Sequence, residues 1–357
     1  MQINFNMKAG ETSDFFSFLY WMYNSEEYRS QLGEYGIKPN DEYEEFMIKL
    51  RKDVKLSEEK LKLYCGKDFS LSDVFISNTD IWNCLELDKC LNFIRQTDKD
   101  MLKFRLIRTL IRTERYGEDI EKIDEQSKII ASDNQKSLEL IKSLEFDSSL
   151  KWELFCFLEE PEKYRDEYVS IMEEMIPIFY KHYEPKRKDI EKFSQYIKGK
   201  LVDNKIDFLK EANIGLFKDD IYEKLFISTS YISYYSLRSG ILGNTNYVYI
   251  GLGFEDSIRQ YRGEEENKLN KYINIYKNFS DPTRFRILKL LVEDKEYCNK
   301  DIAEELGITG ATVSYHMDNL LTAELVTLDR KDRKNYYTVN KDVIMDGIEF
   351  LKRELNL

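Results

Sequence analysis

Short polar side chains recur along one segment, residues 309–319, where they could reach the base edges of a DNA groove. The segment reads TGATVSYHMDN, and hydroxyl, amide and imidazole groups of this kind hydrogen-bond to bases and phosphates. Four cations lie within the five positions 330–334, and positive charge attracts phosphates. The candidate DNA contacts are Thr309, Thr312, Ser314, Tyr315, His316, Asn319, Arg330, Lys331, Arg333 and Lys334. For His316, a core-edge histidine is the open alternative.

The apolar pattern around this segment predicts the helices that would position it. Val313, Met317 and Leu320 recur at i, i+4 and i+7, so a helix over 309–324 has one apolar face and one polar face. A shorter helix over about 299–306 precedes it, and the glycine between the two permits a tight turn. This is the helix-turn-helix arrangement, and its apolar contacts would come from Ile302, Leu306, Ile308 and Val313.

Capping residues and a β-hairpin pattern complete this C-terminal segment. Asp281 can cap the helix before the pair, and Pro282 suits its first turn. Thr309 can cap the polar helix through its hydroxyl. The segments LVTLD and NYYTV flank the cationic cluster and predict a β-hairpin, a wing whose tip would meet phosphates or a minor groove.

The stretch FSDPTRFRILKLL, together with the later DIAEELGITGATVSYHMDNLLTAELVTLDRKDRKNYYTV, resembles the ArsR-type winged-helix regulators. The likeness covers roughly the last quarter of the chain. It implies a DNA-binding homodimer, usually a repressor, that reads double-stranded DNA through Thr309, Thr312, Ser314, Tyr315 and His316. It also implies that the helices at 265–279 and 341–355 build the dimer interface.

Two departures from this family pattern affect the expected chemistry. Metal-sensing members carry two cysteines before the recognition helix, whereas this chain has Cys298 with Lys300 at the expected second position. A thiolate beside an ammonium is a poor soft-metal site, so we expect no metal and no cofactor. Asp318 also places a negative charge on the recognition helix, which weakens attraction or repels wrong sites.

The region before residue 264 has a different pattern. Residues 2–7 alternate as a short strand does, and residues 13–201 show helical spacing. The Tyr- and Ile-rich runs 225–236 and 247–254 predict a β-hairpin with a longer loop between them. Arg262-Gly263, just before the acidic run Glu264–Glu266, predicts the domain junction.

These patterns give a mainly α fold with two domains. Residues 1–263 would form a large, mostly helical dimerisation or sensing domain with a β-hairpin near 225–254. Residues 264–357 would form the winged helix-turn-helix domain. The net charge of −12 argues against a surface coated by nucleic acid, and residues 267–340 hold twelve Lys and Arg against eleven Asp and Glu.

Composition also sets the expected compartment. No apolar run approaches the roughly 20 residues of a membrane span, and the N-terminus lacks a secretory pattern. The five cysteines are scattered, with no CxxC pair, as in a reducing cytoplasm. We therefore expect a cytoplasmic protein with no membrane contact.

We favour a regulator that is not an enzyme and whose N-terminal domain responds to an unknown small-molecule effector or partner. Two alternatives stay open. The winged helix could bind protein, since its charge is nearly neutral, or the N-terminal domain could be an enzyme, although no catalytic constellation stands out. The tyrosines near 231–249 could line a ligand pocket or simply pack the hairpin against helices.

Overall fold

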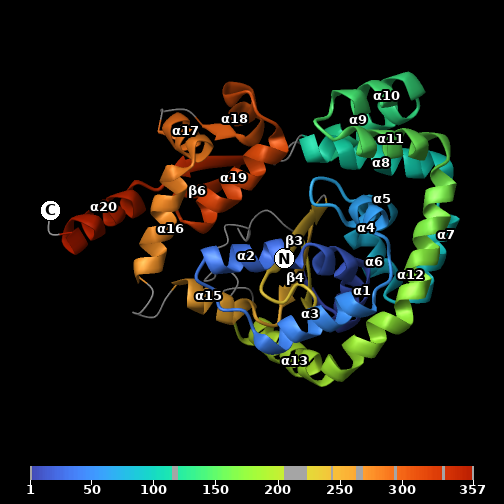
Figure 1. The fold of residues 1–357 in the computed structure, drawn as a ribbon, viewed down its shortest axis with the longest axis horizontal. Helices are drawn as coiled ribbons and strands as arrows, with labels where there is room; N and C mark the ends of the chain where they lie inside the picture. Colours follow the sequence, from blue (N-terminus) through green and yellow to red (C-terminus); the bar gives the residue numbers. More distant parts are fainter. Residues whose placement is uncertain are drawn as a thin grey trace. The chain divides into compact units, whose positions relative to one another are not determined.

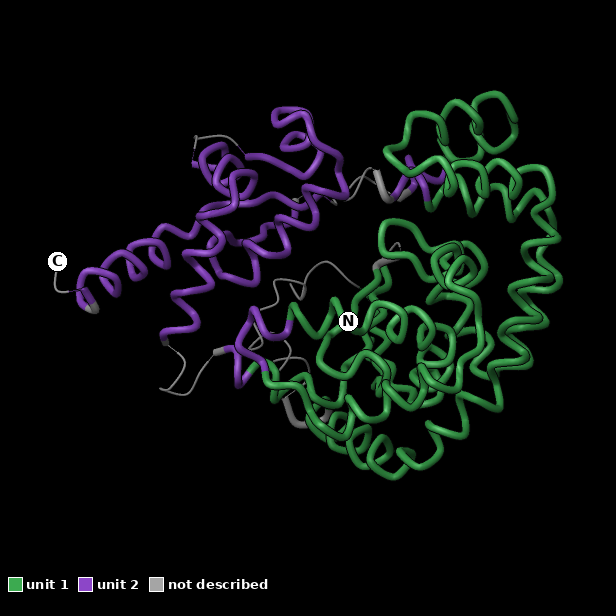
Figure 2. The backbone as a smooth tube through the Cα atoms, in the orientation of Figure 1, with its two compact units in different colours: residues 1–31, 38–109, 125–258 green, residues 32–37, 110–124, 259–357 purple. Residues whose placement is uncertain are grey.

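The chain divides into two compact units. The computed structural model describes residues 2–114, 120–204, 223–242, 244–262, 268–292, 296–331 and 334–355. Unit 1 comprises Met1–Gln31, Lys38–Thr109 and Glu125–Ile258, and unit 2 comprises Leu32–Ile37, Leu110–Asp124 and Arg259–Leu357 (Figure 2). The predicted junction at Gly263 and Glu264–Glu266 lies outside the described residues.

Helices dominate the first two hundred residues, as the apolar spacing predicts (Figure 1). They are α1 (Met7–Tyr23), α2 (Ser25–Glu34), α3 (Asp41–Asp53), α4 (Glu58–Cys65), α5 (Ser72–Phe75), α6 (Asn78–Cys84), α7 (Leu87–Gln96), α8 (Lys99–Glu114), α9 (Ile120–Ala131), α10 (Asn134–Ser143), α11 (Ser148–Glu159), α12 (Pro161–Tyr183) and α13 (Arg187–Asn204), with the 3₁₀ turn η1 (Glu184–Lys186). Among the described helices, none is both long and apolar enough to cross a membrane.

A four-stranded sheet joins the two ends of unit 1. Its strands are β1 (Gln2–Phe5), β2 (Lys224–Ser230), β3 (Leu237–Leu242) and β4 (Thr245–Gly251), in the order β1-β2-β4-β3. The predicted strand at the N-terminus is confirmed, and it pairs in parallel with β2, Gln2 opposite Lys224. Helix α15 (Phe254–Arg262) comes directly after the sheet.

The prediction that runs 225–236 and 247–254 pair as a hairpin is wrong. Strand β2 runs parallel to β4, and the hairpin is instead β3–β4, whose β3 occupies most of the segment that we predicted as a loop. The chain leaves the sheet after Ser230 because its next residues form a turn, in which the Ser233 amide and hydroxyl both donate to the Ser230 hydroxyl. Asn244, which comes directly before β4, lies in a turn, and asparagine is a common turn residue; Gly243 lies outside the described residues.

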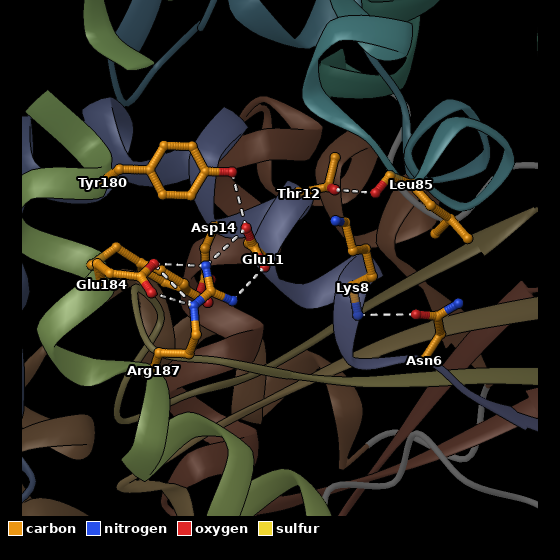
Figure 3. Close-up of polar contacts among 10 residues, drawn as sticks. Asn6, Lys8, Glu11, Thr12, Asp14, Leu85, Tyr180, Glu184 and Arg187 are labelled. Atoms are coloured by element: carbon orange, nitrogen blue, oxygen red, sulfur yellow. Dashed lines mark hydrogen bonds and ion pairs between the residues drawn. The ribbon is translucent and has the colours of Figure 1, made fainter. Parts of the chain in front are cut away.

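Helix α1 packs closely on strand β2. A Cβ on Gly10 would lie 2.0 Å from the Thr229 carbonyl oxygen, so only glycine fits there. Side chains then fix the helix to its neighbours, as Figure 3 shows for Glu11, which accepts from Tyr180 of α12 at 2.9 Å and pairs with Arg187 of α13 at 3.0 Å. The first turns of α1 are therefore held on several sides.

Asp14 of α1 is fully buried against the turn that comes after β2. Its carboxylate accepts hydrogen bonds from the Ser230 hydroxyl, from the Tyr231 amide at 2.8 Å and from the Tyr183 hydroxyl at 3.2 Å. Burial raises the pKa of Asp14 from 3.8 to about 6, although its hydrogen bonds with Ser230 and Tyr231 and the charge of Arg238 oppose the shift. The tyrosines of this region are mostly buried against other rings, with Tyr43 and Tyr234 stacked at 4.8 Å.

The C-terminal part of unit 2 is a small helical domain with a three-stranded sheet. Its elements are α16 (Lys268–Ser280), α17 (Pro282–Leu291), β5 (Tyr297–Cys298), α18 (Asn299–Leu306), α19 (Gly310–Thr322), β6 (Val326–Lys331), β7 (Lys334–Val339) and α20 (Lys341–Leu355). The sheet order is β5-β7-β6, all antiparallel. One apolar cluster joins α16–α19 with this sheet, and it includes the fully buried Ile287, Ile302, Val313 and Leu320. The predicted winged helix-turn-helix fold is confirmed.

Candidate nucleic-acid interface

Helix α17 begins as its sequence predicts. The Asp281 carboxylate accepts from the backbone amides of Thr283 at 2.9 Å and Arg284 at 2.8 Å, two of the amides that a helix start leaves without partners. Pro282 occupies the first turn, where its missing amide hydrogen costs nothing.

The turn between α18 and α19 sets the direction of the polar helix. Gly307 adopts a φ of +64°, the left-handed region that favours glycine, and this ends α18. Thr309 then caps α19, its hydroxyl accepting from the Thr312 amide at 3.1 Å. The Thr309 hydroxyl is therefore engaged in capping the helix, which leaves it less available to hydrogen-bond to a base.

The inner face of α19 anchors it to the core. Val313, Met317 and Leu320 are each at most 1 % exposed, in the spacing that the sequence predicts. Ile302 on α18 is equally buried, while Leu306 and Ile308 pack partly buried against the same cluster. The four predicted apolar contacts of the two-helix unit are thus confirmed, and they fix which side of α19 is left outward.

The outer face of α19 carries three of the predicted contact residues. Thr312 is exposed, Tyr315 is 48 % exposed, and Ser314 between them is half-buried. Asp318 is exposed on the same helix, so a negative charge stands one turn after Ser314. Hydroxyl groups with one nearby carboxylate make a surface that can donate and accept hydrogen bonds but attracts phosphate weakly.

The structure buries two residues that the sequence assigned to DNA contact. His316 is 9 % exposed, with its Nδ1 4.0 Å from a carboxylate oxygen of Asp281. Burial lowers the pKa of His316, although the Asp281 carboxylate opposes this effect, so the imidazole is neutral at pH 7. Asn319 is 8 % exposed, and its amide donates to the Tyr315 carbonyl at 2.8 Å.

Sequence reasoning left open that His316 is a core-edge histidine, but it did not connect this residue with the Asp281 cap of another helix. Asp281 lies far earlier in the chain, and no local pattern connects the two residues. The available signal was the position of His316 three residues after Val313, which places it next to the buried face of α19. His316 and Asn319 are therefore both packed inside the domain, where they help to hold α19 in place.

The predicted wing is present as the hairpin β6–β7. Its register pairs Arg330 with Asn335 and Lys331 with Lys334, which places the cations at the tip. Arg330 and Lys334 are half-buried. Arg333 lies outside the described residues, and the Lys331 side chain does too, although its backbone belongs to β6.

Cys298 stands at the start of α18 and is buried. Burial, and secondly a hydrogen bond with Asp301, raises the pKa of its thiol, which keeps the sulfur protonated at neutral pH. Within the described residues, no three His, Cys, Asp or Glu side chains are grouped so as to hold a metal ion.

Comparison with known proteins adds to this geometry. The profile described as "Bacterial regulatory protein, arsR family" matches residues 281–327, from the Asp281 cap to β6. The transcriptional repressor SdpR of Bacillus subtilis is 36 % identical over 83 residues, which cover 91 % of that protein and 23 % of this chain. This chain belongs to the ArsR family.

Two other relatives align over a similar length. An uncharacterized HTH-type transcriptional regulator of Methanocaldococcus jannaschii is 34 % identical over 84 residues, 94 % of its length and 24 % of this chain. The arsenical resistance operon repressor of Bacillus subtilis is 32 % identical over 76 residues, 72 % of its length and 21 % of this chain. The ArsR-family domain makes the protein a DNA-binding transcriptional regulator, and each of these alignments covers less than a quarter of the chain.

Proposed function

We propose that the protein is a transcriptional repressor that binds a two-fold symmetric DNA site as a homodimer. The observation that carries the proposal is the two-sided helix α19. Its apolar side is locked into the core of the ArsR-family domain, while Thr312 and Tyr315 on its other side are exposed. The repressor assignment is based on the names of the relatives SdpR and the arsenical resistance operon repressor.

We propose different roles for the ten candidate contacts. Thr312, Ser314 and Tyr315 would meet bases or phosphates in the major groove. The wing cations Arg330, Lys331, Arg333 and Lys334 would contact phosphates. Thr309, His316 and Asn319 would hold α19 in position, since the first caps it and the other two are buried.

Helices α16 and α20 support the homodimer. They pack on each other through Tyr272 and Phe350, whose rings stack at 3.9 Å, and through the Tyr276 hydroxyl, which donates to the Gly347 carbonyl at 2.7 Å. Large apolar side chains nevertheless remain exposed along both helices: Leu269, Ile273, Met345, Ile348, Leu351 and Leu355. A second copy of the same pair would bury them.

For residues 1–263 we propose a sensing role in the cytoplasm, where the DNA target would lie, with residues 264–357 as the DNA-binding domain. A small molecule or a partner that binds one conformation better than another would shift the DNA affinity. We propose regulation rather than catalysis for this region because the family match is to regulators.

The DNA part of the proposal is tested by fluorescence anisotropy with labelled fragments from upstream of the protein's own gene, at two salt concentrations. We expect one fragment to bind far more tightly than a scrambled duplex, with affinity that falls as salt rises. Affinity that is indifferent to both sequence and salt would contradict the proposal and favour a winged helix that binds protein.

A four-site variant, R330A/K331A/R333A/K334A, tests the wing. We expect DNA affinity to fall about 100-fold and its salt dependence to become less steep, because phosphate contacts are lost. The matched control K49A/R51A/K52A removes three exposed cations from α3 and should leave DNA binding unchanged. Equal behaviour of the two variants would overturn the assignment of the wing.

The dimer is tested by sedimentation velocity. We expect Ile348→Glu combined with Leu351→Glu to convert a dimer to a monomer, because two charges would enter an apolar interface. Lys352→Glu on the same helix, at an exposed position, is the control and should stay dimeric. A wild-type protein that is monomeric at high micromolar concentration would refute this part.

A further inference from the structure

A cleft within unit 1 has the size and lining of a small-molecule site. Its volume is about 1010 Å³, at the upper end of the range for ligand pockets. Helix α4 and the turn after it line one part, and the turn before α11, with α11 and α12, lines another. The cleft thus lies among helices that are distant in sequence, and a ligand in it would contact several of them at once.

Aromatic rings form an apolar base in this cleft. Phe69 and Phe146 contribute rings from different segments, with centroids 5.8 Å apart. Tyr164 of α12 also lines the cleft and is largely buried, and its hydroxyl donates to Glu153 at 2.7 Å. Phe69 and Tyr164 are buried, whereas Phe146 is half-buried, so the Phe146 ring is the one that offers a surface to an aromatic ligand or to a cation.

The lysines that line the cleft are already matched by carboxylates. Lys60 pairs with Glu167 at 2.6 Å, and Lys62 pairs with Asp147 at 2.8 Å. Lys67 pairs with Glu27, and Lys163 pairs with Glu160 at 3.0 Å. An anionic ligand would have to compete with these carboxylates for every lysine.

The acidic side chains of the lining exceed the basic ones, six against four. Glu59 on α4 and Glu145 in the turn before α11 are exposed, and neither forms an ion pair with another described residue. These two carboxylates stand on different segments of the lining. A ligand with positive charge would gain from both without breaking an existing pair.

We infer that this cleft binds a small organic cation with an aromatic body, which would be the effector of the regulator. The aromatic body would lie on Phe146, which packs on the buried ring of Phe69, and the positive charge would be balanced by Glu59 and Glu145. The inference rests on the proposed function for its regulatory meaning, although binding in the cleft can be measured without DNA.

Two xanthene dyes with related ring systems separate charge from shape. We expect the cationic dye rhodamine 6G to bind the full-length protein saturably, as measured by fluorescence polarisation, and the anionic dye fluorescein to bind at least about tenfold more weakly. Equal binding of the two dyes, or no saturable binding of rhodamine 6G, would overturn the inference.

Variants place the dye in the cleft. We expect E59Q/E145Q to weaken rhodamine 6G binding about tenfold, because each exposed charge contact contributes a few-fold. Phe146→Ala should weaken it by a similar factor through loss of the ring surface. Glu174→Gln, an exposed carboxylate of α12 outside the cleft lining, is the control and should bind the dye as the wild type does.

Two further measurements keep the outcomes distinct. Circular dichroism shows whether each variant is folded, and E59Q/E145Q changes only exposed side chains, so it tests the cleft even if Phe146→Ala unfolds. If E59Q/E145Q binds rhodamine 6G unchanged, the inference fails. If operator binding is retained while the dye does not bind, the cleft assignment fails alone; if the dye binds but no DNA does, the proposed function fails instead.

Discussion

Unit 1 and the ArsR-family domain differ in how far along the chain the contacts inside each of them reach. In the ArsR-family domain, Asp281 caps a helix through amides two and three residues later, and Thr309 caps the next through an amide three residues later. The caps of unit 1 are equally local, as when Asn40 accepts from the Tyr43 amide three residues later, but the buried Asp14 also accepts from Ser230 and Tyr231 at the far end of the unit. Local contacts leave a sequence pattern, and distant ones do not.

The largest expected effect tests the close packing of unit 1. Gly10→Ala should lower the free energy of unfolding of unit 1 by at least about 3 kcal/mol, because the added Cβ meets the Thr229 carbonyl, a backbone group that cannot rotate away. Urea unfolding monitored by tryptophan fluorescence measures this, since all three tryptophans (Trp21, Trp82 and Trp152) belong to unit 1.

Gly199→Ala is the control for this prediction. Nothing lies within 4 Å of a Cβ at this position of α13, so the substitution should be neutral or stabilise by up to about 1 kcal/mol. If Gly10→Ala unfolds at the wild-type urea concentration, the close contact between α1 and β2 is not a feature of the folded protein.

The second prediction concerns the exposed face of α19. Tyr315→Ala should weaken operator binding by about 1–3 kcal/mol, the range for a lost base contact, with no change in unfolding because the ring is 48 % exposed. Anisotropy measures the affinity, and far-UV circular dichroism measures the stability. If Tyr315→Ala lowers the stability and leaves DNA affinity unchanged, Tyr315 contributes to the packing of the domain and not to DNA binding.

The third prediction uses the buried carboxyl of Asp14. Because its pKa is raised to about 6 in the folded chain, the folded state binds a proton that the unfolded state releases, and stability rises as pH falls through 6 toward 3.8. From pH 7 to pH 5 we expect an Asp14-dependent gain of about 1 kcal/mol. The measurement is the difference between wild type and Asp14→Asn in urea unfolding at the two pH values.

This gain should be absent in Asp14→Asn, whose side chain cannot titrate. Other carboxyl groups contribute equally to both proteins, so they cancel in the difference. An identical pH dependence of the two proteins would show that folding does not raise the pKa of Asp14. That result would contradict the prediction, which follows from the full burial of this carboxyl group.

The smallest effect tests the turn before α19. Gly307→Ala should cost about 1 kcal/mol, since its φ of +64° is unfavourable for a residue with a Cβ although the space around it is open. Gly307→Asn should cost less, because asparagine tolerates this region better. The full-length protein is heated in steps, and operator binding is measured at each temperature. The temperature at which binding is lost reports the unfolding of the ArsR-family domain and is compared between the variants.

The winged helix could be predicted from sequence because its signals are short-range. The Asp281 and Thr309 caps, the Gly307 turn and the spacing of Val313, Met317 and Leu320 all lie within a few residues of what they determine. Such signals could not reveal that His316 packs beside Asp281, which depends on how two helices meet.

In unit 1 the strands β1, β2 and β4 were recognisable from sequence, but β3 and the pairing of the strands were not. The runs beginning at 225 and 247 are strands, yet whether two strands pair in parallel depends on the path between them. The segment 237–242 contains a glycine and polar residues, which suggested a loop, although its pairing with β4 makes it a strand. Tertiary context decided both outcomes.

The pairing of β1 with β2 has a consequence for synthesis on the ribosome. The first residues of the chain have their sheet partner only after residue 224 has been made, and the sheet is complete only after Gly251. The helices translated between these points can pack on one another, but unit 1 cannot be completed before that sheet has formed, and contacts of such long sequence separation slow folding. Among the described residues, the ArsR-family domain has no partner strand at the start of the chain, and the ring of Tyr272 in its first helix stacks on Phe350 in its last helix, within the same domain.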